Sequence, residues 1–184
     1  MEILLASASP RRKMLLEQIG IFPRIIPSGI EEKVTKTEPS EVVMELSSMK
    51  AEDIAYRYQE KTGEGIVIGA DTVVAAEGRI LGKPADEEEA VRMITMLQGS
   101  SHQVYTGVTL IRIREGKVQE KRTFAEETEV FVYPMDEQEI AAYVKSGDPM
   151  DKAGAYGIQG AFAAYIKGIK GDYSNVVGLP VGRT

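Results

Sequence analysis

The sequence predicts a mixed α/β fold in which helices flank a mixed, strongly twisted sheet. Segments of helical and of strand character alternate along the chain, as in folds that combine helices with a sheet. The run Ile66–Ile68 is apolar without alternation, which is typical of a strand buried on both faces. Glu-Gly pairs at 77–78 and 115–116 indicate turns between adjacent strands, so hairpins should be present.

The chain should open with a short buried strand over residues 2–6 and a helix. Ser9 can cap that helix, Pro10 suits its first turn, and Gly20 ends it. A second strand is expected over Arg24–Pro27.

A long helix is expected next, over Pro39–Thr62, with Gly63 after its end. Lys50 falls on its apolar stripe, where an unpaired ammonium would be costly. Lys50 should therefore either extend along the stripe towards solvent or reach a phosphate. The stripe itself runs through Val43, Leu46 and Ile54.

The second half predicts a helix, two long strands and another helix. The first helix, Asp86–Gln98, should turn Val91, Ile94 and Leu97 inward. The strands are expected over 103–114 and 118–132.

The second of these helices should begin at an Asp-x-x-Glu capping box, Asp136 with Glu139. It should run to Lys145 and close at Gly147. A last strand is expected over Phe162–Ile166.

Composition narrows the class of protein. With 184 residues, one domain over 1–184 is expected, with two lobes. The chain has no cysteine, which excludes thiolate metal sites and a cysteine nucleophile. A net charge of −6 without a basic run argues against a nucleic-acid partner, and no apolar run is long enough to span a membrane. Without an export signal, a cytoplasmic location is the simplest expectation.

The turn Ser7–Arg12 is a candidate anion site. A strand passes into a helix there, and the first turn of a helix exposes unpaired N–H groups and a positive dipole end. Arg11 and Arg12 in that turn oppose the dipole, and an anionic ligand would relieve the conflict. The alternative is a pair of solvated arginines on a surface helix.

Asp71 and Glu32 are candidate carboxylates for chemistry. Asp71 follows an apolar strand, so it could be a general base or a magnesium ligand, or a turn residue capping Val73. Glu31 and Glu32 follow Gly29, and one of them could complete a metal site with Asp71 or simply be solvated.

Three further polar residues have both a functional and a structural interpretation. Lys83, in a Gly-Lys-Pro turn, could bind phosphate or be an exposed loop charge. Gln159, in a glycine-rich loop, could read a base edge, or the segment could be a tight structural loop. For His102, the only histidine, a structural role is expected in preference to catalysis.

These segments occur together in an order that resembles the Maf family of nucleotide pyrophosphatases. The resemblance spans the whole chain and is carried by six motifs: ASASPRR, GADTVV, LGKP, VYTGV, DKAGAYGIQG and GDYSNVVGLP. It implies a fold related to inosine triphosphate pyrophosphatases, with an elongated sheet and two lobes around a central cleft. It also implies cleavage between the α- and β-phosphates with a divalent metal, Mg²⁺ before Mn²⁺, and a homodimer.

The resemblance also implies roles for single residues. Asp71 would be the proton acceptor, with Glu32 beside the metal. The phosphates would be bound by Ser7, Arg12, Lys50 and Lys83. The group of the family that prefers dTTP and UTP carries the residues that stand here as Arg11, Thr72 and Gln159. The alternative is a non-catalytic nucleotide-binding regulator of septum formation.

One departure from the family pattern concerns the end of the chain. Family chains usually continue beyond the GLP motif as a terminal helix, whereas this sequence stops at Thr184. We expect this difference to affect packing of the last element more than chemistry.

Overall fold

The computed structural model describes residues 1–59 and 64–184 and confirms the mixed α/β class. It contains two compact units. The first unit comprises Met1–Asp71, Thr106–Glu126 and Gly178–Thr184. The second unit comprises Thr72–Tyr105 and Glu127–Val177.

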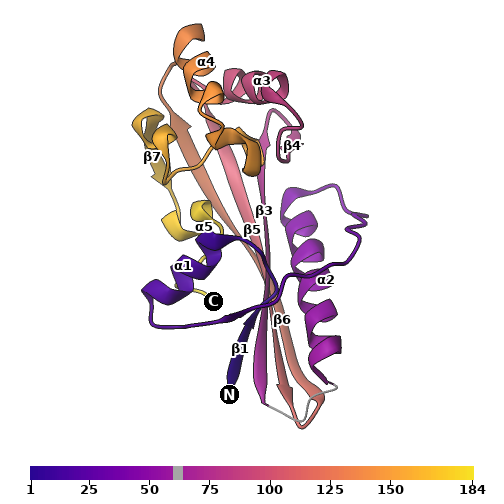
Figure 1. Ribbon diagram of the computed structural model, residues 1–184. Helices are drawn as coiled ribbons and strands as arrows, with labels where there is room; N and C mark the ends of the chain where they lie inside the picture. Colours follow the sequence, from indigo (N-terminus) through magenta and orange to yellow (C-terminus); the bar gives the residue numbers. More distant parts are fainter. Residues whose placement is uncertain (60–63) are drawn as a thin grey trace. The chain divides into compact units, whose positions relative to one another are not determined.

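The first unit begins with β1 (Glu2–Leu5), α1 (Pro10–Gln18) and β2 (Arg24–Ile25), followed by α2 (Pro39–Gln59). β1 pairs in parallel with β2 and with the start of β3 (Gly65–Ala76). The expected start of the long helix is confirmed, whereas its expected end at Gly63 lies outside the described residues. Figure 1 shows α2 running alongside the strands of this unit.

The start of α1 differs from expectation in one respect. Ser9 occupies the cap position with extended backbone angles, but its side chain makes no capping hydrogen bond. Its backbone N–H instead donates to the Ser7 hydroxyl, at 3.2 Å. Gly20 ends the helical segment with a φ of +80°, as expected from a residue without a Cβ.

The face of β3 that meets α2 explains how that helix is positioned. Side chains alternate across a strand, so residues 65, 67, 69 and 71 share one face. Val67 packs in a buried cluster with Ala51 and Ile54 of α2. At Gly69 a Cβ would stand 2.8 Å from the Ala51 Cβ, closer than real side chains approach. Glycine at this position therefore allows α2 to lie directly on the strand.

The second unit contains most of the remaining elements. Its β4 (Arg79–Leu81) pairs antiparallel with β3 through the expected turn, where Glu77 and Gly78 both have positive φ. The elements that lie wholly in this unit are α3 (Glu87–Leu97), α4 (Glu137–Lys145), three short 3₁₀ helices η1 (Asp148–Asp151), η2 (Ala153–Ala155) and η3 (Ala161–Tyr165), β7 (Ile166–Lys170) and α5 (Tyr173–Val177). It also contains parts of β5 (Ser101–Arg114) and β6 (Lys117–Val132).

Strands β3, β5 and β6 supply residues to both units. The strands of the described residues pair in the order β2-β1-β3-β5-β6-β7, with β4 paired to β3. Parallel and antiparallel pairs both occur, which confirms the mixed sheet. No helix in residues 1–59 and 64–184 has both the length and the hydropathy of a membrane-spanning segment.

The capping box of α4 is confirmed, since Asp136 and Glu139 bond each other's backbone N–H groups.

Two other expectations about the second unit are wrong. Val91 points outward with 37% of its surface exposed, while Met93 takes the inward position beside Ile94.

The strand expected over Phe162–Ile166 is the other error. Most of that segment is the 3₁₀ helix η3, and the strand begins only at Ile166. Phe162 is fully buried against the rings of Tyr143 and Tyr156. The packing of the Phe162 ring in the core therefore decides the conformation of this segment, against the local sequence pattern that predicts a strand.

Candidate active site

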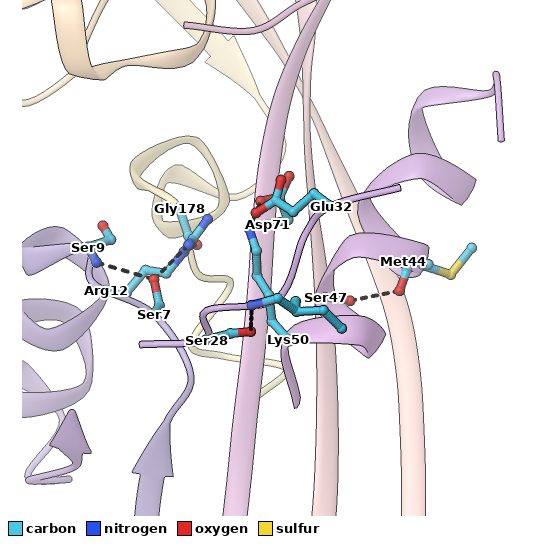
Figure 2. A network of polar contacts seen from close by, with 11 residues as sticks. Ser7, Ser9, Arg12, Ser28, Glu32, Met44, Ser47, Lys50, Asp71 and Gly178 are labelled. Carbon is cyan, nitrogen blue, oxygen red and sulfur yellow. Dashed lines mark hydrogen bonds and ion pairs between the residues drawn. The ribbon is translucent and has the colours of Figure 1, made fainter. Parts of the chain in front are cut away.

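Lys50 and two carboxylates form an ion cluster in the first unit. The Lys50 Nζ lies 2.5 Å from Asp71 Oδ1 and 2.9 Å from Glu32 Oε1. The side chains of Lys50 and Asp71 are each only 16% exposed, whereas Glu32 is 47% exposed. Figure 2 shows the two carboxylates approaching from different segments, β3 and the loop before α2. The sequence interpretations of Lys50 as a solvent-extended side chain and of Asp71 as a turn residue are both wrong.

The cluster exists because α2 lies close to the sheet. Gly69 shares the face of Asp71 and leaves no space for a side chain against Ala51, the residue after Lys50. Gly107 of β5 similarly meets the backbone of α2, at the Val43 carbonyl. Sequence reasoning missed both glycines, although an isolated glycine within a strand pattern signals close backbone approach.

Ser7 and Arg12 form a second polar group in the first unit. The Arg12 Nη1 donates to the Ser7 hydroxyl at 2.9 Å, and its Nε donates to the Gly178 carbonyl at 2.8 Å. Ser7 is buried and accepts a further bond from the Ser9 N–H. Both bonds use the oxygen of Ser7 as acceptor, so its O–H can still donate. Figure 2 shows the same network.

The charge of Arg12 is costly in this position. Burial lowers the pKa of Arg12 below its ordinary value, Asp71 acts to raise it, and Arg11 acts to lower it. Arg11 itself is partly exposed. Two neighbouring guanidinium groups at the start of a helix would gain from a bound anion.

The loop that carries Glu32 is fastened to α2 on both sides. Ser28 donates to Asp53 Oδ2 at 2.8 Å, and Arg57 donates to the same oxygen at 2.7 Å. Thr35 donates to Glu45 from its backbone at 2.8 Å and from its hydroxyl. The bond from the Thr35 hydroxyl is the largest cause that lowers the pKa of Glu45. Sequence reasoning missed these attachments because the partners are separated in the sequence.

The three other candidate residues lie in the second unit. Thr72 is partly buried in β3, next to Asp71 in the sequence. Lys83 is exposed, and the preceding Gly82 accepts a backbone bond from Gly154 at 3.0 Å. Gln159 is exposed in a turn between two glycines.

The carboxylates of Asp71 and Glu32 fit a divalent metal. Both already face one cation, the Lys50 ammonium. Mg²⁺ is commonly held by one or two carboxylates together with substrate phosphates and water. The described part of the chain contains no group of three or more acidic, histidine or cysteine side chains placed to hold an ion, so substrate phosphates and water would complete the coordination.

The structural role expected for His102 agrees with its position. His102 is 1% exposed, and its Nε2 bonds the Tyr156 hydroxyl at 2.7 Å. Burial lowers the pKa of His102 to about 4. His102 therefore lies inside the second unit as a neutral imidazole bonded to Tyr156.

Comparison with known proteins shows the family to which the chain is related. The family described as Maf-like protein matches residues 2–184. A dTTP/UTP pyrophosphatase of Agathobacter rectalis is 56% identical, over 99% of this chain and 93% of that protein. A dTTP/UTP pyrophosphatase of Lachnoclostridium phytofermentans is 50% identical, over 99% of this chain and 91% of that protein. A solved dITP/XTP pyrophosphatase of Mycobacterium abscessus is 13% identical over 73% of this chain and 76% of its own, with a TM-score of 0.40, too low to bear on function. The chain belongs to the Maf-like protein family.

Proposed function

We propose that this chain hydrolyses nucleoside triphosphates to the monophosphate and pyrophosphate, with dTTP and UTP as preferred substrates. The observation that carries the proposal is the Asp71–Lys50–Glu32 cluster, in which a general-base candidate, a cation and a metal-ligand candidate lie within direct contact. The relatives named dTTP/UTP pyrophosphatase, at 56% and 50% identity, support the substrate class.

In the reaction, water attacks the α-phosphorus and the bond to the oxygen that bridges to the β-phosphorus breaks. Pyrophosphate leaves with the electrons of that bond, and the water proton passes to Asp71. Lys50 already binds Oδ1 of Asp71, so we assign Oδ2 as the oxygen that accepts the proton. Phosphoryl transfer of this kind depends on positioning and on neutralising charge more than on covalent chemistry.

The phosphate oxygens are assigned to one hydroxyl and two cationic side chains. The Ser7 hydroxyl has its proton available, because both observed bonds use its oxygen as acceptor. Arg12 is held in place by Ser7 and the Gly178 carbonyl, which lowers the cost of ordering it on binding. Lys83 is assigned the same role because it is an exposed cation in a constrained Gly-Lys-Pro turn.

Asp71 and Glu32 are assigned as the residues that hold a divalent cation, Mg²⁺ in preference to Mn²⁺. The cation would neutralise charge on the phosphate oxygens as the leaving group departs. Arg11, Thr72 and Gln159 are assigned to base recognition. The cytoplasmic location and the homodimer stay predictions of this proposal.

The decisive experiment measures pyrophosphate release by the purified protein with Mg²⁺ and each common nucleoside triphosphate. We expect release from dTTP and UTP and clearly slower release from ATP and GTP. Binding of dTTP without pyrophosphate release would instead support the non-catalytic regulator. Equal kcat/KM for GTP and dTTP would contradict the preference for pyrimidines.

A further inference from the structure

Gln159 lies in a tight turn of the second unit whose two ends are glycines. The Gly160 N–H donates to the Gly157 carbonyl at 3.1 Å, which closes the turn around residues 158 and 159. Ile158 is buried, whereas Gln159 is exposed. The turn therefore anchors one side chain in the unit and presents the next one to solvent.

Each glycine of this turn lies against one member of an ion pair. A Cβ at Gly157 would stand 2.6 Å from Lys152 Cε, and one at Gly160 would stand 2.9 Å from Asp148 Oδ2. The φ of Gly160 is −93°, a value that any residue adopts. A side chain at position 160 would therefore displace the Asp148 carboxylate, although the backbone angles there suit any residue.

The ion pair is itself fixed to the core. The side chains of Lys152, Asp148 and Asp151 are 13%, 29% and 63% exposed. Lys152 Nζ lies 3.1 Å from Asp148 Oδ1 and 2.7 Å from Asp151 Oδ1. It also donates to the Asp148 backbone carbonyl at 2.5 Å. The buried Tyr143 of α4 donates its hydroxyl to the other oxygen, Oδ2, at 2.8 Å. The ring of Tyr143 packs on Phe162, so the carboxylate is tied to the aromatic core.

A partly buried ion pair is poor evidence for stability, because desolvation offsets much of the attraction. The pair does, however, fix the orientation of both side chains. Each oxygen of Asp148 accepts a hydrogen bond from a different donor, Tyr143 or Lys152. Both ends of the turn therefore rest on side chains that are themselves bonded, and this contact favours one position of the turn.

We propose that Asp148 and Lys152 are positioning residues for base recognition, since their ion pair sets the turn that presents Gln159. The inference rests on the proposed function, because it needs Gln159 to contact the base. A site discriminates between bases because the wrong base leaves polar groups without hydrogen-bond partners. A shift of the turn should therefore lower the selectivity between bases more than it lowers kcat.

The first test is Gly160→Ala, which adds one methyl group against the Asp148 carboxylate. Its control is Gly168→Ala in β7, where a Cβ would meet no atom within 4 Å. We expect the ratio of kcat/KM for dTTP to that for GTP to fall about tenfold in Gly160→Ala, with kcat for dTTP nearly unchanged. Gly168→Ala should keep the ratio of the unmodified protein. An unchanged ratio in Gly160→Ala would overturn the proposal.

A second variant tests the proposal independently, in case Gly160→Ala does not fold. Lys152→Met keeps the stem and removes the charge, with Lys145→Met on the exposed side of α4 as the matched control. We expect the ratio to fall in Lys152→Met only. A fall in melting temperature with no change of the ratio would mean that the ion pair is structural, which contradicts the inference.

Binding separates this inference from the proposed function. Dissociation constants for dTMP and dGMP, measured by calorimetry, need no turnover. If the unmodified protein releases no pyrophosphate from any nucleotide, the proposed function fails, and the ratio of the two constants still tests the turn. Equal affinity of the unmodified protein for dTMP and dGMP would overturn the inference.

Discussion

Gly69 of β3 lies directly against Ala51 of α2, so that a Cβ at position 69 would stand 2.8 Å from the Ala51 Cβ. Lys50 precedes Ala51, and Asp71 follows Gly69 on the same face of the strand. The close approach of helix and strand therefore brings the lysine ammonium to the aspartate carboxylate.

The first prediction is that Gly69→Ala separates this pair. The added methyl group must push α2 from β3, because it would meet the Ser47 carbonyl and the Ala51 backbone nitrogen. Overpacking of this kind costs about 1–3 kcal/mol. We expect a lower midpoint of denaturation and a lower kcat for dTTP. Gly182→Ala, where a Cβ would meet no atom within 4 Å, is the control. Unchanged activity in Gly69→Ala would contradict the role of this contact.

The second prediction concerns Asp71→Asn. The amide keeps the shape of the side chain but is a far weaker base, and loss of a general base typically lowers the rate by ~10²–10⁴. We expect kcat to collapse while dTTP still binds, as measured by calorimetry alongside steady-state kinetics. Glu32→Gln should raise the Mg²⁺ concentration needed for half-maximal rate, but kcat at saturating Mg²⁺ should fall less than in Asp71→Asn, because the general base is kept. Near-normal kcat in Asp71→Asn would remove this residue from the mechanism.

The third prediction separates two cations assigned to the phosphates. Arg12 bonds Ser7 and the Gly178 carbonyl, so Arg12→Ala should lower both the melting temperature of the free protein and kcat/KM. Lys83 is exposed, so Lys83→Ala should lower kcat/KM and leave the melting temperature unchanged. The measurements are thermal denaturation without ligand and dTTP kinetics. Normal kinetics in Lys83→Ala would show that this lysine does not bind the phosphates and is only an exposed charge in a loop.

The fourth prediction is that Gln159→Glu erodes the preference for pyrimidines. Uracil and thymine present two carbonyl acceptors beside one N–H donor, which a glutamine amide can complement. Glutamate replaces the donor with an acceptor, so kcat/KM for dTTP should fall by more than that for GTP. Competition assays with both nucleotides give the ratio directly. Equal losses for the two substrates would count against base recognition by Gln159.

The fifth prediction concerns acid stability. Burial lowers the pKa of His102 to about 4 from its ordinary value of 6.5, so between these values the unfolded chain binds the extra proton. The free energy of unfolding should therefore fall as the pH drops from 6.5 towards 4, by about 3 kcal/mol from this group. His102→Gln keeps a polar partner for Tyr156 and should show a shallower fall. Urea denaturation of both proteins at several pH values isolates the histidine, since the carboxylates are common to both.

Several local features could be predicted because their partners are neighbours in the sequence. The capping box of Asp136 and Glu139 joins residues three positions apart, and both bonds are present. The turn at Glu77 and Gly78 needs two positive φ values, and both occur. Such features depend on backbone chemistry within a few residues, so tertiary packing seldom changes them.

The sequence by itself determined the mixed fold class, most element positions and the family resemblance. Only the tertiary structure decided that Lys50 binds Asp71 and Glu32, and that Arg12 is held by Ser7 and the Gly178 carbonyl. These contacts join segments far apart in the chain, and they require α2 to approach the sheet as closely as Gly69 allows. The sequence shows which side chains are able to form ion pairs and hydrogen bonds. Which of them come into contact depends on how closely the helix and strand backbones pack.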